Sequence, residues 1–436
     1  MRLKGQAFKH LLWVGGLVSL TKFIAIFSTL VISRKFGVSE QLDAYVLAIT
    51  LPAFVVGTLG GALAGAFLPA YLEAKVLGKQ AQTLLLSSVS SIIPLIFVPL
   101  LLLMYLGSRP IMGIWAPGYS LDTVDSIIML TGLLAPTVIF SGMAGIYSAA
   151  LNSELRFRET AISQAYAPLL IFLALLTFPA EWGFVPVVLA ATLASIFEYL
   201  TLKRALPKYG LETRFTLKPC KATLKLLIPR FSAVALASVF IGGVTLVDQI
   251  MAAAVGPGAV SLYMLGTKIP TGILGILTAV VGSVMGAYLS KQFMLAPKRA
   301  IRYYYETIGM AFMLGLFFAL VLFYYSAALN SLLYGSGKIS SVQLGPITEI
   351  TAAYAFIMVG AILWPLLGRT ALALNASRIL LYGALCLILV KVVLSYILSD
   401  IRGVSGLALA SSIAYAVSVL IMGIGLHFRF KTMSKG

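Results

Sequence analysis

Long apolar stretches alternate with short polar segments along the whole chain. Twelve of these stretches are predicted to cross a membrane as helices, because about 20 apolar residues in a helix span roughly 30 Å of hydrocarbon. The second, eighth and tenth stretches are long and interrupted by Gly and Pro, so we expect them to bend or tilt. The predicted spans are residues 10–33, 41–72, 81–106, 123–150, 160–180, 184–202, 226–253, 258–290, 303–327, 345–374, 377–399 and 404–427.

The composition favours a membrane protein and gives no support to enzyme chemistry. Hydrophobic residues make up 60% of the 436 residues and charged residues 11%, with a mean hydropathy of +1.01. A soluble protein has about a quarter of its residues charged. The sequence contains no nucleotide-binding glycine loop, HExxH or nucleophile motif. We therefore predict a transporter without a cofactor, driven by an ion gradient, the membrane potential or the substrate gradient.

The net charge of +18 comes mainly from basic residues between the apolar spans. This placement is typical of topology signals and does not indicate a nucleic-acid surface. With the N-terminus inside, 22 Lys and Arg residues fall at the inner ends of spans and 5 at the outer ends. The asymmetry predicts an inner-membrane, multi-pass protein with both termini in the cytoplasm.

The two halves of the chain are similar in sequence. Four pairs of segments match in the same order, at separations of 217 to 223 residues. Since each copy holds an even number of spans, the copies share one membrane orientation, which implies a pseudo-two-fold axis along the membrane normal. The pairs are 45–52 with 263–270, 65–72 with 282–289, 148–153 with 371–376, and 183–194 with 403–414.

These features together predict an all-α membrane protein. About 12 transmembrane helices would form two parallel six-helix repeats around a central cavity. The predicted parts are an N-terminal six-helix lobe over residues 1–205, a basic cytoplasmic linker over 206–224 and a C-terminal six-helix lobe over 225–436.

Basic residues inside the spans are the first candidates for function. An ionisable group near the bilayer centre costs about 3 kcal/mol or more, so its presence calls for a role. Lys22, Lys268 and Arg369 lie in the first, eighth and tenth spans, which could line a central cavity. There they would present cationic groups to an anionic substrate such as a diphosphate. The alternative is local pairing or extension to an interface.

Acidic residues supply the remaining candidates. Asp248 and Lys391 lie deep in the seventh and eleventh spans, so we expect either an internal ion pair or a coupling site for a proton or a monovalent cation. Asp43 is a candidate gate residue or a cap of its own helix, the second span. Glu349 is a candidate gate residue or a surface residue.

A family resemblance is carried by residues around the second span. The segments 34–37 (RKFG), 43–45 (DAY), 60–74 (GGALAGAFLPAYLEA) and 115–119 (WAPGY) resemble the MviN/MurJ lipid II flippases, a branch of the multidrug/oligosaccharidyl-lipid/polysaccharide exporter superfamily. The resemblance implies a bacterial inner-membrane protein. It also implies alternating-access flipping of a polyprenyl-diphosphate-linked glycan precursor, either lipid II or a related cell-envelope or exopolysaccharide intermediate. Enzymes of envelope biosynthesis are then candidate partners.

The resemblance also bears on individual positions. Lys22 keeps a basic residue in the first span, and Ser28 stands where a family arginine is expected. With Lys268 and Arg369, these residues form the predicted substrate-binding set. Lys391 falls where the family tends to place Asn, near a sodium site for which the Asp248 position is a candidate member.

Two other functions compete with a flippase. One is a drug exporter of the related MATE type, which for organic cations should carry acids and aromatic residues in its cavity. The ionisable residues within these spans are instead mostly basic. The other is a non-transporting scaffold of MurJ type that recruits envelope enzymes. This interpretation is favoured by the absence of arginines that the family places in its cavity, such as the one expected at Ser28.

Overall fold

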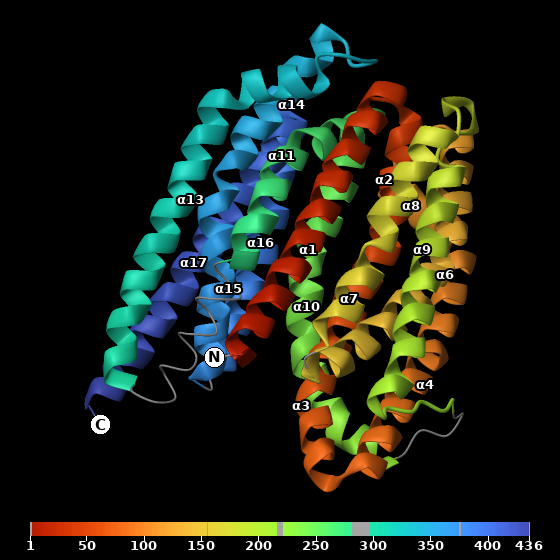
Figure 1. Ribbon diagram of the computed structural model, residues 1–436. Coiled ribbons are helices and arrows are strands. Elements are labelled where there is room, and N and C mark those ends of the chain that lie inside the picture. Colours follow the sequence, from red (N-terminus) through yellow and green to blue (C-terminus); the bar gives the residue numbers. More distant parts are fainter. Residues whose placement is uncertain (1, 155, 216–220, 281–296, 375, 436) are drawn as a thin grey trace. The chain divides into compact units, whose positions relative to one another are not determined.

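The computed structural model describes residues 2–154, 156–215, 221–280, 297–374 and 376–435, whose long elements are all helices (Figure 1). In this part of the chain, 11 helical segments are long and apolar enough to cross a membrane. They correspond to the second to twelfth predicted spans. The first predicted span falls within α1 (Arg2–Lys35), a helix of 34 residues. The prediction of an all-helical membrane fold is therefore confirmed.

The chain divides into two compact units. The first contains residues up to Phe36 together with Ala44–Gly242, and the second contains Gly37–Asp43 and Gly243–Gly436. The boundary at Gly242 falls inside α10 (Lys221–Val255). The helix α2 (Glu40–Val55) begins in the second unit and continues in the first from Ala44. The first unit also holds, besides α1, the helices α3 (Gly61–Leu77), α4 (Lys79–Leu106), α5 (Ser108–Trp115), α6 (Leu121–Ser153), α7 (Phe157–Gln164), α8 (Tyr166–Thr177) and α9 (Val185–Ala205). The second unit holds α11 (Ala259–Val280), α13 (Pro297–Tyr334), α14 (Ser341–Ala355), α15 (Ile357–Ala373), α16 (Ser377–Arg402) and α17 (Val404–Lys435).

The long spans predicted to bend contain interruptions. In the second span, a π-helical segment, Val56–Gly60, joins α2 to α3. It follows Pro52, which lacks the N–H that would continue the α-helical hydrogen bonds. The tenth span is divided at Phe356 between α14 and α15. Of the eighth span, residues 281–290 lie outside the described part.

The core of the first unit lies where α3, α4, α6 and α9 meet. Phe67, Tyr71, Phe97 and Tyr147 are buried there, and aromatic side chains of this size bury large apolar areas. At the edge of this core, the Tyr71 hydroxyl donates a hydrogen bond of 3.3 Å to Glu154. The phenol of a buried tyrosine thus reaches a carboxylate at the end of α6.

In the first unit, a cation also stabilises the end of α8. The Lys35 ammonium donates to the carbonyl of Leu175 at 2.5 Å and to that of Phe178 at 2.8 Å. The last carbonyls of a helix lack partners within the helix and carry partial negative charge, so an ammonium group is favourable at this position.

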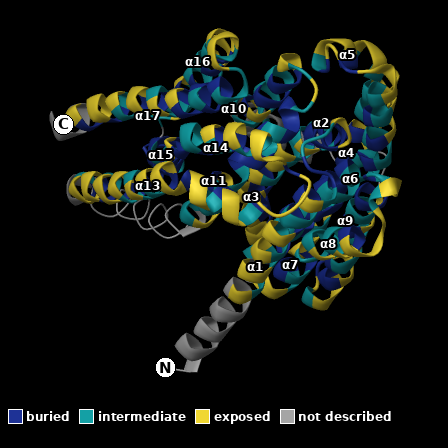
Figure 2. Ribbon diagram, turned by 90° about the horizontal axis from the view of Figure 1, so that it is seen from above, coloured by how far each residue is buried: buried dark blue, intermediate teal, exposed yellow. Residues whose placement is uncertain are grey.

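The second unit packs around α15. Ile362, Leu363 and Leu366 are buried against side chains of α11, α13 and α17. Exposed residues recur along α13 (Figure 2), including Met313 and Phe317, which are 67% and 60% exposed. A lipid bilayer can cover these side chains, so an apolar exposed face is expected on a membrane helix.

The close approach of α15 and α17 depends on Gly360, and replacing this glycine tests that packing. A Cβ atom at Gly360 would lie 2.7 Å from the Cβ of Tyr415 and 2.9 Å from its backbone carbonyl carbon. Because the obstruction includes backbone, we expect Gly360→Ala to destabilise the protein by about 1–3 kcal/mol. Thermal unfolding of the purified protein in detergent measures this loss.

The matched control is Gly309→Ala in α13, where no described atom lies within 4 Å of the added Cβ. This change should be neutral or slightly stabilising, since Ala favours the helix. Equal melting temperatures for the two variants would contradict the packing argument.

Candidate functional site

Among the described residues, three charged side chains are buried: Asp43, Asp248 and Lys391. All three belong to the second unit. A buried charge in a membrane protein needs partners within the protein, because neither lipid nor water is there to solvate it. The partners of these side chains therefore define the first candidate sites.

Asp43 lies at the start of α2 and binds the start of α11. One carboxylate oxygen accepts a hydrogen bond from the backbone N–H of Gly258 at 2.5 Å, and the other accepts one from the N–H of Ser261 at 2.6 Å. These N–H groups precede or begin a helix, where they have no partner within it and where a negative charge is favoured. Asp43 thus caps α11, although the sequence suggested a cap on its own helix.

The Asp43 contact joins two equivalent positions of the sequence repeat. Ser261 lies 218 residues after Asp43, the same separation as between Tyr45 and Tyr263 in the matching segments. Within the second unit, the first copy thus supplies a carboxylate to the backbone of the second copy.

Asp248 and Lys391 form an ion pair between α10 and α16. The Lys391 ammonium also donates to the Ser411 hydroxyl at 2.7 Å and to the Leu407 carbonyl at 2.8 Å, both on α17. A lysine ammonium has three N–H donors, so these three acceptors match its capacity. The Ser411 hydroxyl lies 3.3 and 3.4 Å from the two carboxylate oxygens of Asp248.

Apolar side chains adjoin this polar cluster on the same helices. Val244, Leu387 and Ala414 form a buried cluster that brings together α10, α16 and α17. Each lies three or four residues along its helix from a member of the polar cluster, so the ion pair adjoins a dry interface. Exclusion of water strengthens the electrostatic attraction within the pair.

The predicted substrate-binding residues are divided between the two units, with Lys22 and Ser28 in the first and Lys268 and Arg369 in the second. Lys22 is exposed on α1 and Ser28 is buried on the same helix, its hydroxyl donating to the Ile24 carbonyl at 2.9 Å. Lys268 on α11 is half-buried and Arg369 on α15 is exposed, and both interact with neighbouring groups. Their role in binding substrate stays a prediction.

Glu349 is exposed and lines a cavity of about 480 Å³ in the second unit, together with Arg402. Phe323 and Phe356 supply aromatic walls. The cavity thus combines one acidic and one basic side chain with apolar surface. The gate role and the surface role of Glu349 both stay predictions.

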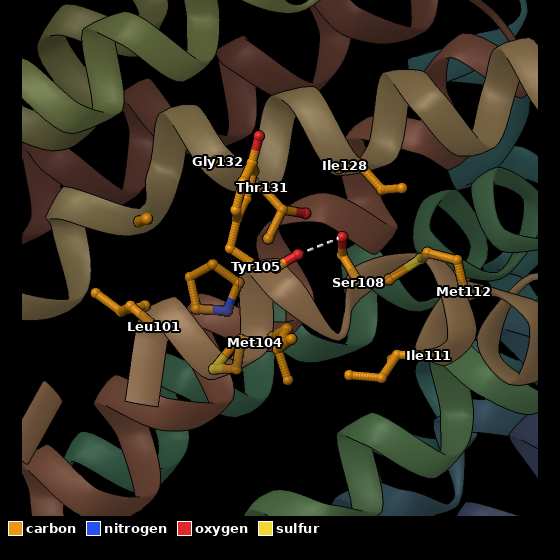
Figure 3. Close-up of a pocket in the computed structure, with 12 residues that line it drawn as sticks. Leu101, Met104, Tyr105, Ser108, Ile111, Met112, Ile128, Thr131 and Gly132 are labelled. Atoms are coloured by element: carbon orange, nitrogen blue, oxygen red, sulfur yellow. Dashed lines mark hydrogen bonds between the residues drawn. The ribbon is translucent and has the colours of Figure 1, made fainter. Parts of the chain in front are cut away.

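The first unit contains a small apolar pocket of about 30 Å³ between α4, α5 and α6 (Figure 3). Met104 and Met112 line it, and the Ser108 hydroxyl beside them donates to the Tyr105 carbonyl at 2.7 Å. This polar group is thus already satisfied. The pocket therefore offers a ligand mainly apolar contact.

Sequence analysis missed the partners of Lys391 on α17. Leu407 contributes a backbone carbonyl, which leaves no trace in the sequence. Ser411 lies in the segment 403–414 that matches the first half, but its match there is an alanine in 183–194. Only a hydroxyl inside an apolar span could have drawn attention to it. The described residues contain no group of three or more His, Cys, Asp or Glu side chains that could hold a metal ion.

Comparison with known proteins decides the family. A family model for the lipid II flippase MurJ matches residues 32–435. The chain belongs to the MurJ family. The resemblance seen in the sequence is thereby confirmed, and so is the prediction of a multi-pass membrane transporter, since the family consists of transporters and not enzymes.

Individual MurJ proteins are similar over most of their length. The lipid II flippase MurJ of Burkholderia cenocepacia is 24% identical over 444 residues, covering 97% of this chain and 84% of the relative. The probable lipid II flippase MurJ of Thermotoga maritima is 24% identical over 405 residues, covering 92% and 81%.

Solved structures show the same fold. An inward closed conformation of lipid II flippase MurJ has a TM-score of 0.82 at 20% identity and covers 95% of this chain and 87% of that one. An inward-facing multidrug resistance MATE transporter of the MOP superfamily has a TM-score of 0.75 at 15% identity, covering 95% of each chain. At these identities the likeness establishes the fold alone.

The Asp43 cap generates a stability test. Asp43→Ala would leave two backbone N–H groups without their acceptors, so we expect a loss of about 1–3 kcal/mol in the free energy of unfolding. Asp43→Asn keeps one side-chain oxygen as an acceptor and should lose less. Chemical or thermal unfolding in detergent measures both.

Asp122→Ala serves as the control, since Asp122 is an exposed acid in the first turn of α6. Its loss should change stability by a few tenths of a kcal/mol. An Asp43→Ala protein as stable as this control would refute the capping role.

Proposed function

We propose that this protein is a flippase that translocates a polyprenyl-diphosphate-linked glycan precursor across the bacterial plasma membrane by alternating access. The observation that carries the proposal is the match of the lipid II flippase family model to residues 32–435. The relatives from Burkholderia and Thermotoga bear the same name and align over most of their length. The substrate is lipid II or a related envelope or exopolysaccharide intermediate, since these share the lipid diphosphate.

The orientation proposed for the chain places both termini in the cytoplasm. The support is the distribution of Lys and Arg, 22 at the inner ends of spans and 5 at the outer ends. In this orientation, the start of α2, the start of α11 and the Glu349 cavity face the outer side.

The proposed substrate contacts are cationic. Lys22, Lys268 and Arg369 would bind the diphosphate through charge-assisted hydrogen bonds, which are roughly twice as strong as neutral ones. Ser28 would contribute a hydroxyl from the same helix as Lys22. A lipid diphosphate must leave water to cross the bilayer, and fixed cations would offset part of that cost.

Asp43 is proposed as the outer gate residue. Its bonds to Gly258 and Ser261 hold the start of α2 to the start of α11. Breaking them would release the two helix ends from each other, at the cost of two charge-assisted hydrogen bonds. Glu349, near Arg402 in its cavity, is the second candidate gate residue.

No resident cofactor is part of the proposal. A proton or a monovalent cation is the candidate coupling species. Asp248 and Lys391 form the internal ion pair that is the alternative to a coupling site at these two residues. Enzymes that make or use the lipid-linked glycan are the candidate partners, because they act on the same molecule at the two membrane faces.

The two competing functions make different demands. The fold is shared with MATE exporters, but the excess of basic residues within the spans disfavours an organic cation as substrate. A scaffold that transports nothing would tolerate loss of the cationic residues. Experiments on bound lipid and on these residues therefore separate the three functions.

Lipid that copurifies with the protein tests the substrate class. Mass spectrometry of mildly solubilised protein should detect a polyprenyl diphosphate carrying sugars, enriched over the same lipid in the whole membrane. Adding excess polyprenyl diphosphate should displace this lipid from the protein and lower its amount in the purified sample. Recovery of bulk phospholipid alone would count against the flippase.

Neutralising two cations tests the substrate contacts. We expect Lys22→Ala combined with Lys268→Ala to lower the flipping rate in reconstituted vesicles at least about tenfold. Each lost hydrogen bond to a charged group is worth about 1.5–3 kcal/mol, and about 1.4 kcal/mol corresponds to a factor of ten.

The control carries Lys79→Ala and Lys208→Ala, which remove two exposed lysines near span ends. It should flip lipid at the rate of the natural protein. Unchanged activity in the Lys22/Lys268 variant would exclude the proposed contacts, and a scaffold would show no flipping in any variant.

A further inference from the structure

The oxygen cluster around Lys391 has the composition of a cation site. Its acceptors are the Asp248 carboxylate, the Leu407 carbonyl and the Ser411 hydroxyl. Hard cations in proteins take carboxylate, carbonyl and hydroxyl oxygens. In membrane transporters, such oxygens near the middle of the bilayer bind Na⁺ or H⁺. Here the position at the centre of these oxygens is held by the ammonium of a side chain.

The ammonium is covalently fixed and fully enclosed. Lys391 has no exposed surface and the Asp248 side chain is 7% exposed. All three N–H donors of the ammonium have acceptors, so the group is satisfied where it lies. A dissolved cation would have to displace a bonded charge from a dry interface, which is strongly unfavourable because an unpaired buried ammonium is costly.

Two further buried polar atoms lie on the helices that supply the ion pair. The Ser395 hydroxyl is buried one helical turn after Lys391, and the Gln249 side-chain oxygen is buried next to Asp248 in the sequence. Neither has a hydrogen-bond partner among the described residues. Buried polar atoms are rarely left unpaired. The two atoms belong to α16 and α10, the helices that supply Lys391 and Asp248.

We infer that Lys391 is a tethered cation that permanently fills a monovalent-cation site formed by α10, α16 and α17. The sodium site implied by family resemblance then does not fit this chain, because the ammonium lies at its centre. The natural protein would need no dissolved sodium to hold these helices together. Removing the ammonium, while keeping Asp248, would open the site to Na⁺. This inference does not depend on which lipid is transported.

The test compares the natural protein with Lys391→Ala in sodium chloride and in choline chloride at equal ionic strength. Choline is too large to enter a site sized for an ammonium group. The melting temperature of the natural protein should be the same in both salts. That of Lys391→Ala should be lower in choline and should rise saturably with sodium, because a ligand that binds the folded state stabilises it. Binding of radioactive sodium should approach about one ion per chain in the variant only.

Two control variants separate site opening from general damage. In Lys391→Ala combined with Asp248→Asn, the cluster is neutral, so the melting temperature should not respond to sodium. Arg378→Ala removes an exposed cation of α16 and should leave the protein insensitive to sodium, like the natural chain. Vesicle flipping gives a second readout, since sodium should restore activity to Lys391→Ala and should not change that of the natural protein.

Several results would overturn the inference. One is a natural protein that binds or is stabilised by sodium. Another is a folded Lys391→Ala protein that responds to none of lithium, sodium and potassium. If Lys391→Ala fails to fold in either salt while the neutral double variant folds, no ion enters the site. If both fail, Lys391 serves packing alone.

Discussion

The second unit is organised by one constraint, which is that a charge buried in a membrane protein must be satisfied by the protein itself. Neither water nor lipid supplies hydrogen bonds at depth. Asp43, Asp248 and Lys391 meet this constraint with different partners. Asp43 takes backbone N–H groups at a helix start, whereas Lys391 takes a carboxylate, a carbonyl and a hydroxyl. In each case the charge holds together segments of the second unit that are far apart in the sequence.

Much of the fold could be predicted from the sequence because a membrane-spanning helix is recognised by the length of its apolar stretch, which can be read directly along the chain. The predicted span 377–399 corresponds to α16 (Ser377–Arg402), and the predicted span 404–427 begins where α17 does. The interruption of the second span was predicted from Gly and Pro, whose effect on a helix is local. The π-helical form of this interruption was not predicted, because packing against neighbouring helices decides whether the helix kinks or forms a wider turn.

The candidate sites were less accessible to sequence analysis. That Asp248 and Lys391 should lie close together follows from charge alone, since each is too costly in a span without the other. The partners of Asp43 are backbone groups 215 and 218 residues away, and a backbone N–H is present at nearly every position. The same holds for the Leu407 carbonyl. Partners without a side-chain signature become visible only when the helices are placed in space.

The π-helical segment Val56–Gly60 sets the rotation of everything that follows it in the second span. A π turn accommodates one residue more than an α turn, and each residue turns an α-helix by about 100°. Deleting one residue there would restore regular α-helical winding and keep Phe67 and Tyr71 on the face that packs into the core, whereas a deletion elsewhere in α3 would turn the residues after it by about 100°. In the same way, a related chain with an α-helical second span needs one residue fewer to present the same face. In an alignment of two such chains, the residues after this segment are therefore shifted by one position relative to the residues before it, even where the helices superimpose.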